Sequence, residues 1–526
     1  MRKILILSIS IAISLTAATA QNDAEERYRQ AVKEAFSSYE KFRSQAENSY
    51  NEFRQKANAE YAAFLEQSWE SFKVSPAQPK PTPDPPVQPS LPKEELEDLG
   101  MEDDISNALP QREVKPVAKP QQDNSKKVVK PTATPQPIEL DYGKVVTRPT
   151  VQPQPQPKVP VEEPKVLTHK DLRFNYFGDA LTVRTDAVAR PMHVSSSEES
   201  SIAAAWREAS DGRYDLMLGD CLKLRKELEL CDWGYYMLAR AVTKAHYGDD
   251  SSNDAKLLQA YLLTQSGYKL RLARSGGKIF IMLPSQQTVY TRYVTIDSER
   301  FYFMDDDFKG GSFYVSKAAF DGEQGFSLII TKHPKLSKRN ETCNTYKARR
   351  FGTSVEYCPN KNLVDFYNSY PHCDWQIYAN AKLSEEAKAA IYPTLRQAIA
   401  GKTEAQSANI LIDFVQTAFD YKTDGEQFGG ERSLFCEETF YYPFSDCEDR
   451  AILFTTLVRD LLGLKTALLY YPGHLASAVE FNENVSGDYL TIEGKRYTVC
   501  DPTYIGASIG MTMPTMKDKK VEVTLL

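Results

Sequence analysis

The stretch SDCEDRAILFTTLVRDLLG, residues 445–463, predicts the central helix of the C-terminal part of the chain. Ser445 and Glu448 stand in the S-x-x-E relation of a capping box, which predicts that a helix begins here. Gly463 is a typical residue to end it. Because the residues between are mostly apolar, little polar surface is left, and the helix should lie in the middle of a domain.

Cys447 falls in the first turn of this helix, where we expect it at the second position. Backbone N–H groups point outward there and the helix dipole is positive, so a thiolate is stabilised. Glu448 and Asp449 act against this through their like charge, and a further cation, usually a histidine, is therefore needed. Taken alone, Cys447 could also be a buried structural cysteine, since cysteine is among the most often buried residue types.

His474 and Asp501 stand where two further functional groups are expected. His474 follows a Pro-Gly break between two predicted strands in TALLYYPGHLASAVEF, and Asp501 follows the last strand, KRYTVC. Each alone could be an ordinary turn residue. A strand of five or six residues spans ~17–20 Å. Asp501 can therefore reach His474 only if strand 496–500 runs antiparallel beside 475–481, with 482–495 as an excursion.

A cysteine at a helix start, a histidine at a strand start and an aspartate at a strand end, in this order, resemble the transglutaminase-like superfamily. The matching stretches are FDYKTD (419–424), DCEDRA (446–451), GHLASAV (473–479) and CDPTY (500–504). They cover roughly residues 404–515, about a fifth of the chain. The chain departs from many members in having Leu475-Ala476-Ser477 where an aromatic residue follows the histidine, and in the extra segment FNENVSGDYLTIEGK.

The resemblance implies a papain-like α+β core and acyl-transfer chemistry. Cys447 would be the nucleophile, His474 the general base and then acid, and Asp501 the residue that orients the imidazole. The Cys447 backbone N–H would be one oxyanion donor. The candidates for a side-chain oxyanion donor are Gln427, Tyr441 and Tyr442.

The favoured function is hydrolysis of peptide or isopeptide bonds in proteins or cell-wall peptides. A protein-crosslinking transamidase would use the same residues, and a non-catalytic binding scaffold is the third alternative. No metal site and no cofactor is predicted. The net charge of −7 with interspersed signs indicates no basic face for nucleic acid.

The N-terminal residues predict export and an extended arrangement before the folded part. Residues 1–20 have the pattern of a secretory signal peptide, so the protein should be periplasmic or secreted, without a membrane span. Residues 21–74 predict one long helix for self-association or docking, with aromatic residues eleven apart, the period of a right-handed supercoil. Residues 75–166 hold twenty of the thirty prolines and predict a disordered linker.

The rest of the chain predicts an α+β middle region over 167–380 and the catalytic domain over 381–526, so the fold class is α+β. Export permits disulfides. Cys343, Cys358 and Cys373 lie fifteen residues apart in a helix-poor stretch, and closing a loop of that length contributes ~3 kcal/mol in the chain-entropy model. We expect one bridge among these three and none to Cys447.

Overall fold

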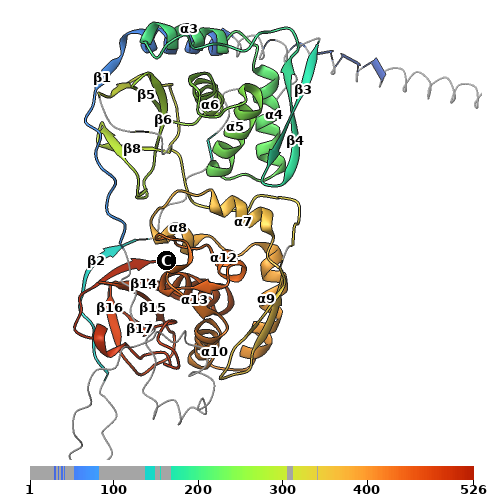
Figure 1. Cartoon of the computed structure of the whole chain (residues 1–526). Coiled ribbons are helices and arrows are strands. Elements are labelled where there is room, and N and C mark those ends of the chain that lie inside the picture. Colours follow the sequence, from blue (N-terminus) through green and yellow to red (C-terminus); the bar gives the residue numbers. More distant parts are fainter. Residues whose placement is uncertain are drawn as a thin grey trace, which may run out of the picture.

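The structure is a computed structural model that describes most of the chain from residue 52 onward. The described ranges are 52–81, 137–147, 154–155, 168–304, 308, 312–340 and 342–526, with eight single positions between residues 29 and 45. The predicted signal peptide, the repeat tyrosines Tyr28, Tyr39 and Tyr50, and most of the proline-rich stretch lie outside these residues. Figure 1 shows two parts stacked one above the other, each with strands and helices, so the predicted α+β class is confirmed.

The upper part contains a six-stranded antiparallel sheet in the order β1-β9-β5-β6-β8-β7. Gly276 and Gly277 join β5 to β6 at φ values of +55° and +80°, which a two-residue turn between right-twisted strands favours. These two strands therefore form a hairpin. The strands are β1 (Trp69–Ser71), β5 (Arg271–Ser275), β6 (Lys278–Pro284), β7 (Tyr293–Ile296), β8 (Glu299–Phe303) and β9 (Tyr314–Ser316).

Four helices and a separate hairpin pack beside this sheet (Figure 1). Helix α6 contacts α3, α5 and β6, which explains why it is buried almost from end to end. Its N-cap is Ser252, whose side chain accepts a hydrogen bond from the Ala255 N–H. The helices are α3 (Glu199–Ala209), α4 (Asp215–Glu227), α5 (Asp232–Tyr247) and α6 (Asn253–Gln265), and the hairpin is β3 (His169–Tyr176) with β4 (Asp179–Asp186).

The lower part contains a second six-stranded sheet, in the order β16-β17-β15-β14-β18-β2. All of its pairs are antiparallel except β18 with β2. Its strands are β2 (Tyr142–Val146), β14 (Lys465–Tyr471), β15 (His474–Glu480), β16 (Tyr489–Ile492), β17 (Lys495–Cys500) and β18 (Val521–Leu525). Its helices are α7 (Lys361–Asn368), α8 (Trp375–Asn380), α9 (Glu385–Ile399), α10 (Glu404–Thr417), α11 (Asp424–Gln427), α12 (Cys436–Tyr441) and α13 (Cys447–Leu462).

Helix α13 is the central helix that the opening stretch predicts. Its residues from Cys447 to Val458 are buried, and it contacts α8, α10, α12, β14 and β15. Gly463 ends it at a φ of +70°, a conformation that glycine adopts without strain. The helix starts differently from the prediction: its N-cap is Asp446, whose N–H donates to Asp449, and Cys447 is the first helical residue. Ser445 does not cap the helix, because its hydroxyl accepts a hydrogen bond from Arg450.

The prediction of a single helix over residues 21–74 is wrong at its C-terminal end. The helix that contains residues 52–67 stops there, and residues 69–71 form β1, which pairs with β9 at the edge of the upper sheet. The gain of sheet hydrogen bonds outweighs helix propensity at this point. Tyr61, from the aromatic repeat, packs against Trp206 and Phe320 at ring-centroid distances of 4.5 and 4.3 Å, so this helix docks on the upper part of its own chain.

The prediction of a disordered linker over residues 75–166 is also wrong for two described segments. Residues 75–81 continue from β1, and residues 142–146 form β2 at the edge of the lower sheet. Leu140 is buried, and its N–H donates to Tyr489 at 2.8 Å. Proline content did not reveal these segments because each is short and owes its order to a partner distant in sequence.

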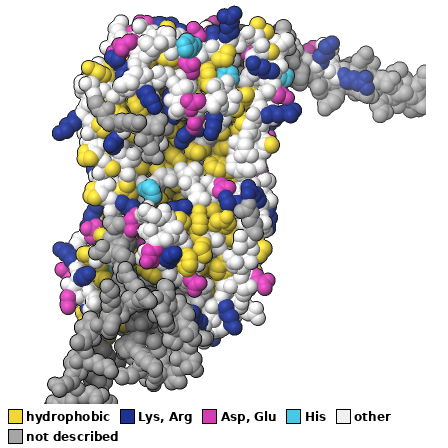
Figure 2. Space-filling view, in the orientation of Figure 1, with side chains coloured by type: hydrophobic (Ala, Val, Ile, Leu, Met, Phe, Trp, Pro, Cys, Tyr) yellow, Lys and Arg dark blue, Asp and Glu magenta, His cyan; other side chains and the backbone are white. Residues whose placement is uncertain are grey.

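The predicted boundary at residue 380 does not separate two cores. Helices α7 and α8 precede it but contact α12 and α13, and one continuous core of buried residues runs through both parts. On the face shown in Figure 2, hydrophobic side chains gather across the junction between the two parts. The two parts are therefore packed together and are not two domains joined only by a linker.

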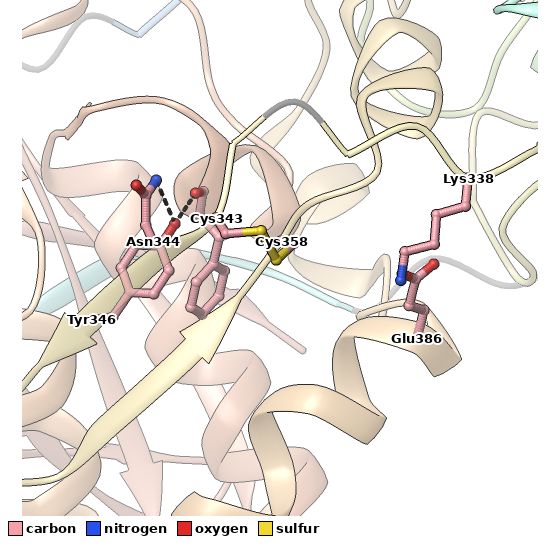
Figure 3. Close-up of a disulfide and its surroundings, with 7 residues drawn as sticks. Lys338, Cys343, Asn344, Tyr346, Cys358 and Glu386 are labelled. Carbon is pink, nitrogen blue, oxygen red and sulfur yellow. Dashed lines mark hydrogen bonds and ion pairs between the residues drawn. A yellow bond between two sulfur atoms is a disulfide. The ribbon is translucent and has the colours of Figure 1, made fainter.

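The disulfide prediction is confirmed. Cys343 and Cys358 are bridged, and Figure 3 shows the bond beside β10 (Asn344–Lys347) and β11 (Ser354–Tyr357), with the Lys338–Glu386 ion pair nearby. The remaining six cysteines, Cys447 and Cys373 among them, are free and buried. No helix among the described residues has the length and apolar character that crossing a membrane requires.

Candidate active site

Cys447 lies at the N-terminus of α13, directly after the short strand β13 (Phe444–Ser445). That strand pairs in parallel with β12 (Asp420–Tyr421), which fixes the direction in which the chain enters the helix. The Cys447 side chain is 1% exposed, and its thiol donates a hydrogen bond to Oε2 of Glu448 at 3.4 Å. The nucleophile predicted from the sequence is thus enclosed and has a carboxyl partner.

His474 and Asp501 form the side-chain pair that the sequence predicts. Nε2 of His474 lies 2.9 Å from Oδ2 of Asp501, and both side chains are buried. Nδ1 of His474 is also buried and has no hydrogen-bond partner among the described residues. One ring nitrogen is therefore committed to the carboxylate, and the other is available for a second group.

The strand register places His474 and Asp501 together. Strand β17 runs antiparallel beside β15, with Ser477 opposite Cys500 and Val479 opposite Thr498, and the Ser477 hydroxyl donates to the Cys500 carbonyl at 2.6 Å. Strand β16 pairs with the far edge of β17 as part of an excursion. This is the arrangement that the sequence requires for the pair, and it is confirmed.

The loop after β17 holds Asp501 in a fixed orientation. Its Oδ1 accepts hydrogen bonds from the N–H groups of Thr503 and Tyr504 at 2.9 and 3.2 Å, which leaves Oδ2 for the histidine. Gln416, on α10, donates through Nε2 to the carbonyls of Asp501, Tyr504 and Ala507 and accepts from the Gly506 N–H. Helix α10 therefore anchors the loop that carries the carboxylate.

Cys447 lies beside the start of β15, the strand that carries His474. Helix α13 contacts β15, and the Leu475 backbone N–H is directed at the Cys447 sulfur. Burial raises the pKa of the Cys447 thiol well above its usual value, and the charges of Glu448 and Asp446 raise it further, while the Leu475 N–H opposes the rise. The thiol is therefore protonated in this arrangement, contrary to the thiolate that its helix position led us to expect.

The reason for this difference is first the burial of the thiol and then the carboxyl groups gathered around the helix start. One oxygen each of Asp424, Asp446 and Asp449 lies within 4.8 Å of the others, and the same holds for Asp424, Glu431 and Glu448. Burial, followed by repulsion between neighbours, raises the pKa of Asp424 and Asp449 to about 8 and that of Glu448 to about 7. These carboxyl groups outweigh the helix dipole, and by position they could also hold a cation.

The three candidate oxyanion donors occupy different surroundings. Gln427 ends α11 and donates through Nε2 to the Phe444 carbonyl at 3.2 Å, three residues before the nucleophile, while its buried Oε1 has no partner among the described residues. The Tyr442 hydroxyl instead donates to Asn368 at 2.9 Å, and the Tyr441 ring packs edge-on against Tyr442. Gln427 is thus tied to the strand that leads into Cys447, whereas Tyr442 is directed at α7.

Sequence reasoning missed two residues close to the nucleophile. Tyr421 pairs with Ser445, two residues before Cys447, and burial raises the pKa of its hydroxyl, as does the charge of Cys447. Arg450 is fully buried in α13, donates to the carbonyls of Gln416 and Phe419, and lies 5.2 Å over the Tyr421 ring. Both residues lie within the stretches FDYKTD and DCEDRA that carry the family resemblance, and this is the signal that could have found them.

Comparison of the chain with protein-family models, with curated proteins and with solved structures gives no match. The resemblance to the transglutaminase-like superfamily therefore rests on the quoted stretches of sequence alone.

Proposed function

We propose that the protein is an exported, cysteine-dependent acyl-transfer enzyme of transglutaminase-like type that hydrolyses peptide or isopeptide bonds. The observation that carries the proposal is the His474–Asp501 pair. Nδ1 of His474 is buried and has no partner among the described residues, and Cys447 at the start of α13 lies beside β15, the strand on which His474 stands. A buried histidine oriented by a carboxylate, close to a helix-start cysteine, is the arrangement that activates a thiol.

The chemistry follows from these positions. The Cys447 thiol leaves Glu448 and gives its proton to Nδ1 of His474. The thiolate then bonds to the carbonyl carbon of an amide, and the negative charge that develops on the oxygen is met by the Cys447 N–H and by Gln427 or Tyr421. The imidazolium returns its proton to the leaving amine as the C–N bond breaks, which leaves a thioester. Water, deprotonated by His474, attacks the thioester and releases the acid and the thiol.

Two alternative functions remain: a transamidase would use the same catalytic residues, and a binding scaffold would use none of them. A transamidase differs only in that an amine outcompetes water for the thioester. A scaffold would use the folded parts for binding without any covalent step. The Cys343–Cys358 disulfide supports the oxidising compartment that the proposed export implies.

The experiment that tests the proposal is labelling by a thiol-reactive amide-mimicking probe, with peptide substrates and a labelled amine in parallel. Cys447→Ala should abolish labelling with little change in melting temperature, and Cys436→Ala, which removes another buried cysteine, should leave it intact. Release of peptide without amine incorporation supports the hydrolase, and incorporation of the amine supports the transamidase. Equal labelling of the wild type and Cys447→Ala would refute the assignment.

A further inference from the structure

The hairpin formed by β10 and β11 depends on its surroundings for its order. Its two strands pair only with each other, over four residues each, and form a two-stranded sheet. A two-stranded hairpin by itself is marginally stable in water. The Cys343–Cys358 disulfide joins its two ends, directly before β10 and directly after β11. This bridge, together with the contacts that the hairpin makes with the lower part, therefore keeps the hairpin ordered.

The first strand of the hairpin contacts the segments that lead into the nucleophile. The Tyr346 hydroxyl accepts a hydrogen bond from Asn344 at 3.3 Å and donates one to the Phe440 carbonyl on α12 (Figure 3). The Tyr346 ring packs edge-on against Phe440 at a centroid distance of 4.9 Å and lies 5.2 Å from the ring of Phe419. Phe419 directly precedes β12, and α12 directly precedes the segment with β13 and Cys447. The hairpin thus supports the entry of the chain into α13.

The tip of the same hairpin contacts the elements that hold Asp501. The Phe351 N–H donates to Oδ2 of Asp413, a buried residue of α10, at 3.0 Å. The Arg350 guanidinium donates to the Ser508 hydroxyl at 3.2 Å, in the loop after β17 that begins with Asp501. Because α10 anchors this loop through its glutamine side chain, the hairpin supports the loop both directly and through α10. One short element therefore contacts both sides of the candidate active site.

The disulfide is the part of the hairpin that a reductant can reach. Cys343 is exposed and Cys358 is half-buried, and both line a surface cavity of about 590 Å³ between the hairpin and α9. The Lys338–Glu386 ion pair lies at the side of this cavity (Figure 3). The six free cysteines are buried. A reductant in solution would therefore meet this bridge before any other cysteine sulfur of the described residues.

We propose that the hairpin positions the catalytic residues of the proposed active site only while the Cys343–Cys358 bridge is intact, so that reduction by a dithiol switches the site off. A thiolate of the dithiol attacks the Cys343 sulfur, and Cys358 leaves and takes up a proton. The second thiol of the reductant then attacks the mixed disulfide, which releases Cys343 as a thiol and leaves the reductant as a disulfide. The effect on catalysis rests on the proposed function, but the effect of the bridge on the order of the Asp501 loop does not.

The test is the rate at which p-nitrophenyl acetate acylates Cys447 in the full chain. It compares the oxidised wild type, the wild type reduced with the phosphine TCEP, and the double variant Cys343→Ser, Cys358→Ser. We expect acylation at least about tenfold slower in the reduced wild type and in the double variant, because a misplacement of about 1 Å can cost about 100-fold in rate. The loss should appear in the maximal acylation rate and not in the ester concentration for half-saturation. Treatment with TCEP should not change the double variant.

A second variant separates positioning from a loss of folding. Tyr346→Phe keeps the bridge and the ring and removes only the hydroxyl that donates to the Phe440 carbonyl. It should slow acylation in the oxidised protein, and it serves as the test if the double variant does not fold. Tyr314→Phe makes the same change at an exposed position of β9 in the upper sheet, and it should acylate at the wild-type rate.

Hydrogen exchange gives a readout that does not depend on catalysis. The N–H groups of Thr503 and Tyr504 donate to Asp501, and their exchange should accelerate when the bridge is reduced. Equal acylation of Cys447 in the oxidised and reduced wild type would overturn the proposal, and so would unchanged exchange of these two amides. If the oxidised wild type forms no acyl-enzyme at all, the proposed function fails, and the exchange of the two amides still decides whether the bridge orders this loop.

Discussion

Replacing Gln416 by leucine tests how the loop that carries Asp501 is held. Leucine has a similar volume, so the change removes hydrogen bonds and creates little cavity. The amide donates to three carbonyls at 2.9–3.1 Å but has two hydrogens, and it accepts one bond from Gly506 at 3.2 Å. The substitution thus removes about three hydrogen bonds. Each loss costs ~1 kcal/mol, because the former partner stays buried and finds no replacement. We expect the free energy of unfolding to fall by about 3 kcal/mol.

The assay is equilibrium unfolding in urea, with hydrogen exchange of the Gly506 amide as a local readout. Gln397→Leu, at an exposed position of α9, makes the same chemical change and should stay within about 0.5 kcal/mol of the wild type. Exchange at Gly506 should accelerate in Gln416→Leu and not in the control. A Gln416→Leu variant as stable as Gln397→Leu, with Gly506 still protected, would refute the reasoning that α10 fixes this loop.

Three further predictions concern the triad, the carboxyl groups and the disulfide. Asp501→Asn should slow acylation of Cys447 about 10³- to 10⁴-fold, because an amide can favour the wrong tautomer of His474. Stopped-flow acylation with an activated ester measures this rate. An unchanged rate would exclude the orienting role of Asp501. The raised pKa values of Asp424, Glu448 and Asp449 mean that the folded protein binds more protons than the unfolded chain between about pH 4 and pH 8, so the free energy of unfolding should fall as pH rises through this range. Urea titrations at several pH values give the slope, which Glu448→Gln should reduce, and a stability that rises with pH would contradict this sign. Replacing Cys343 and Cys358 together by serine should lower the free energy of unfolding by about 3 kcal/mol, the value for a fifteen-residue loop, and an unchanged urea midpoint would show that the bridge contributes nothing.

The elements around the candidate site could be predicted because local chemistry specifies them. The helix of 447–462, the break before His474 and the strand before Asp501 each carry a local signal. The pairing of β15 with β17 follows instead from the requirement that Asp501 approach His474, since β15 is buried on both faces and its burial pattern does not fix a register. The position of Cys447 was predicted one residue too far into its helix, since Asp446 and Ser445 are both good capping residues; Asp446 forms the capping box with Asp449, and the Ser445 hydroxyl accepts from Arg450 instead.

The protonated thiol and the course of residues 75–81 could not be predicted, because both depend on residues far apart in the chain. Burial in the folded core, followed by the charges of Glu448 and Asp446, raises the pKa of Cys447 against the effect of the helix dipole. Residues 75–81 read as part of a linker, since nothing local indicates that Ser75 pairs with the distant Tyr293.

The central claim is that Cys447 forms a thioester with the help of His474. Intact-protein mass spectrometry after incubation with p-nitrophenyl acetate tests it most directly, with Cys447→Ala and His474→Ala treated in parallel. We expect one acetyl group per chain, located on Cys447, removed by hydroxylamine, and absent or strongly slowed in both variants. Acetylation at another residue, or equal acetylation of Cys447 in His474→Ala, would contradict it.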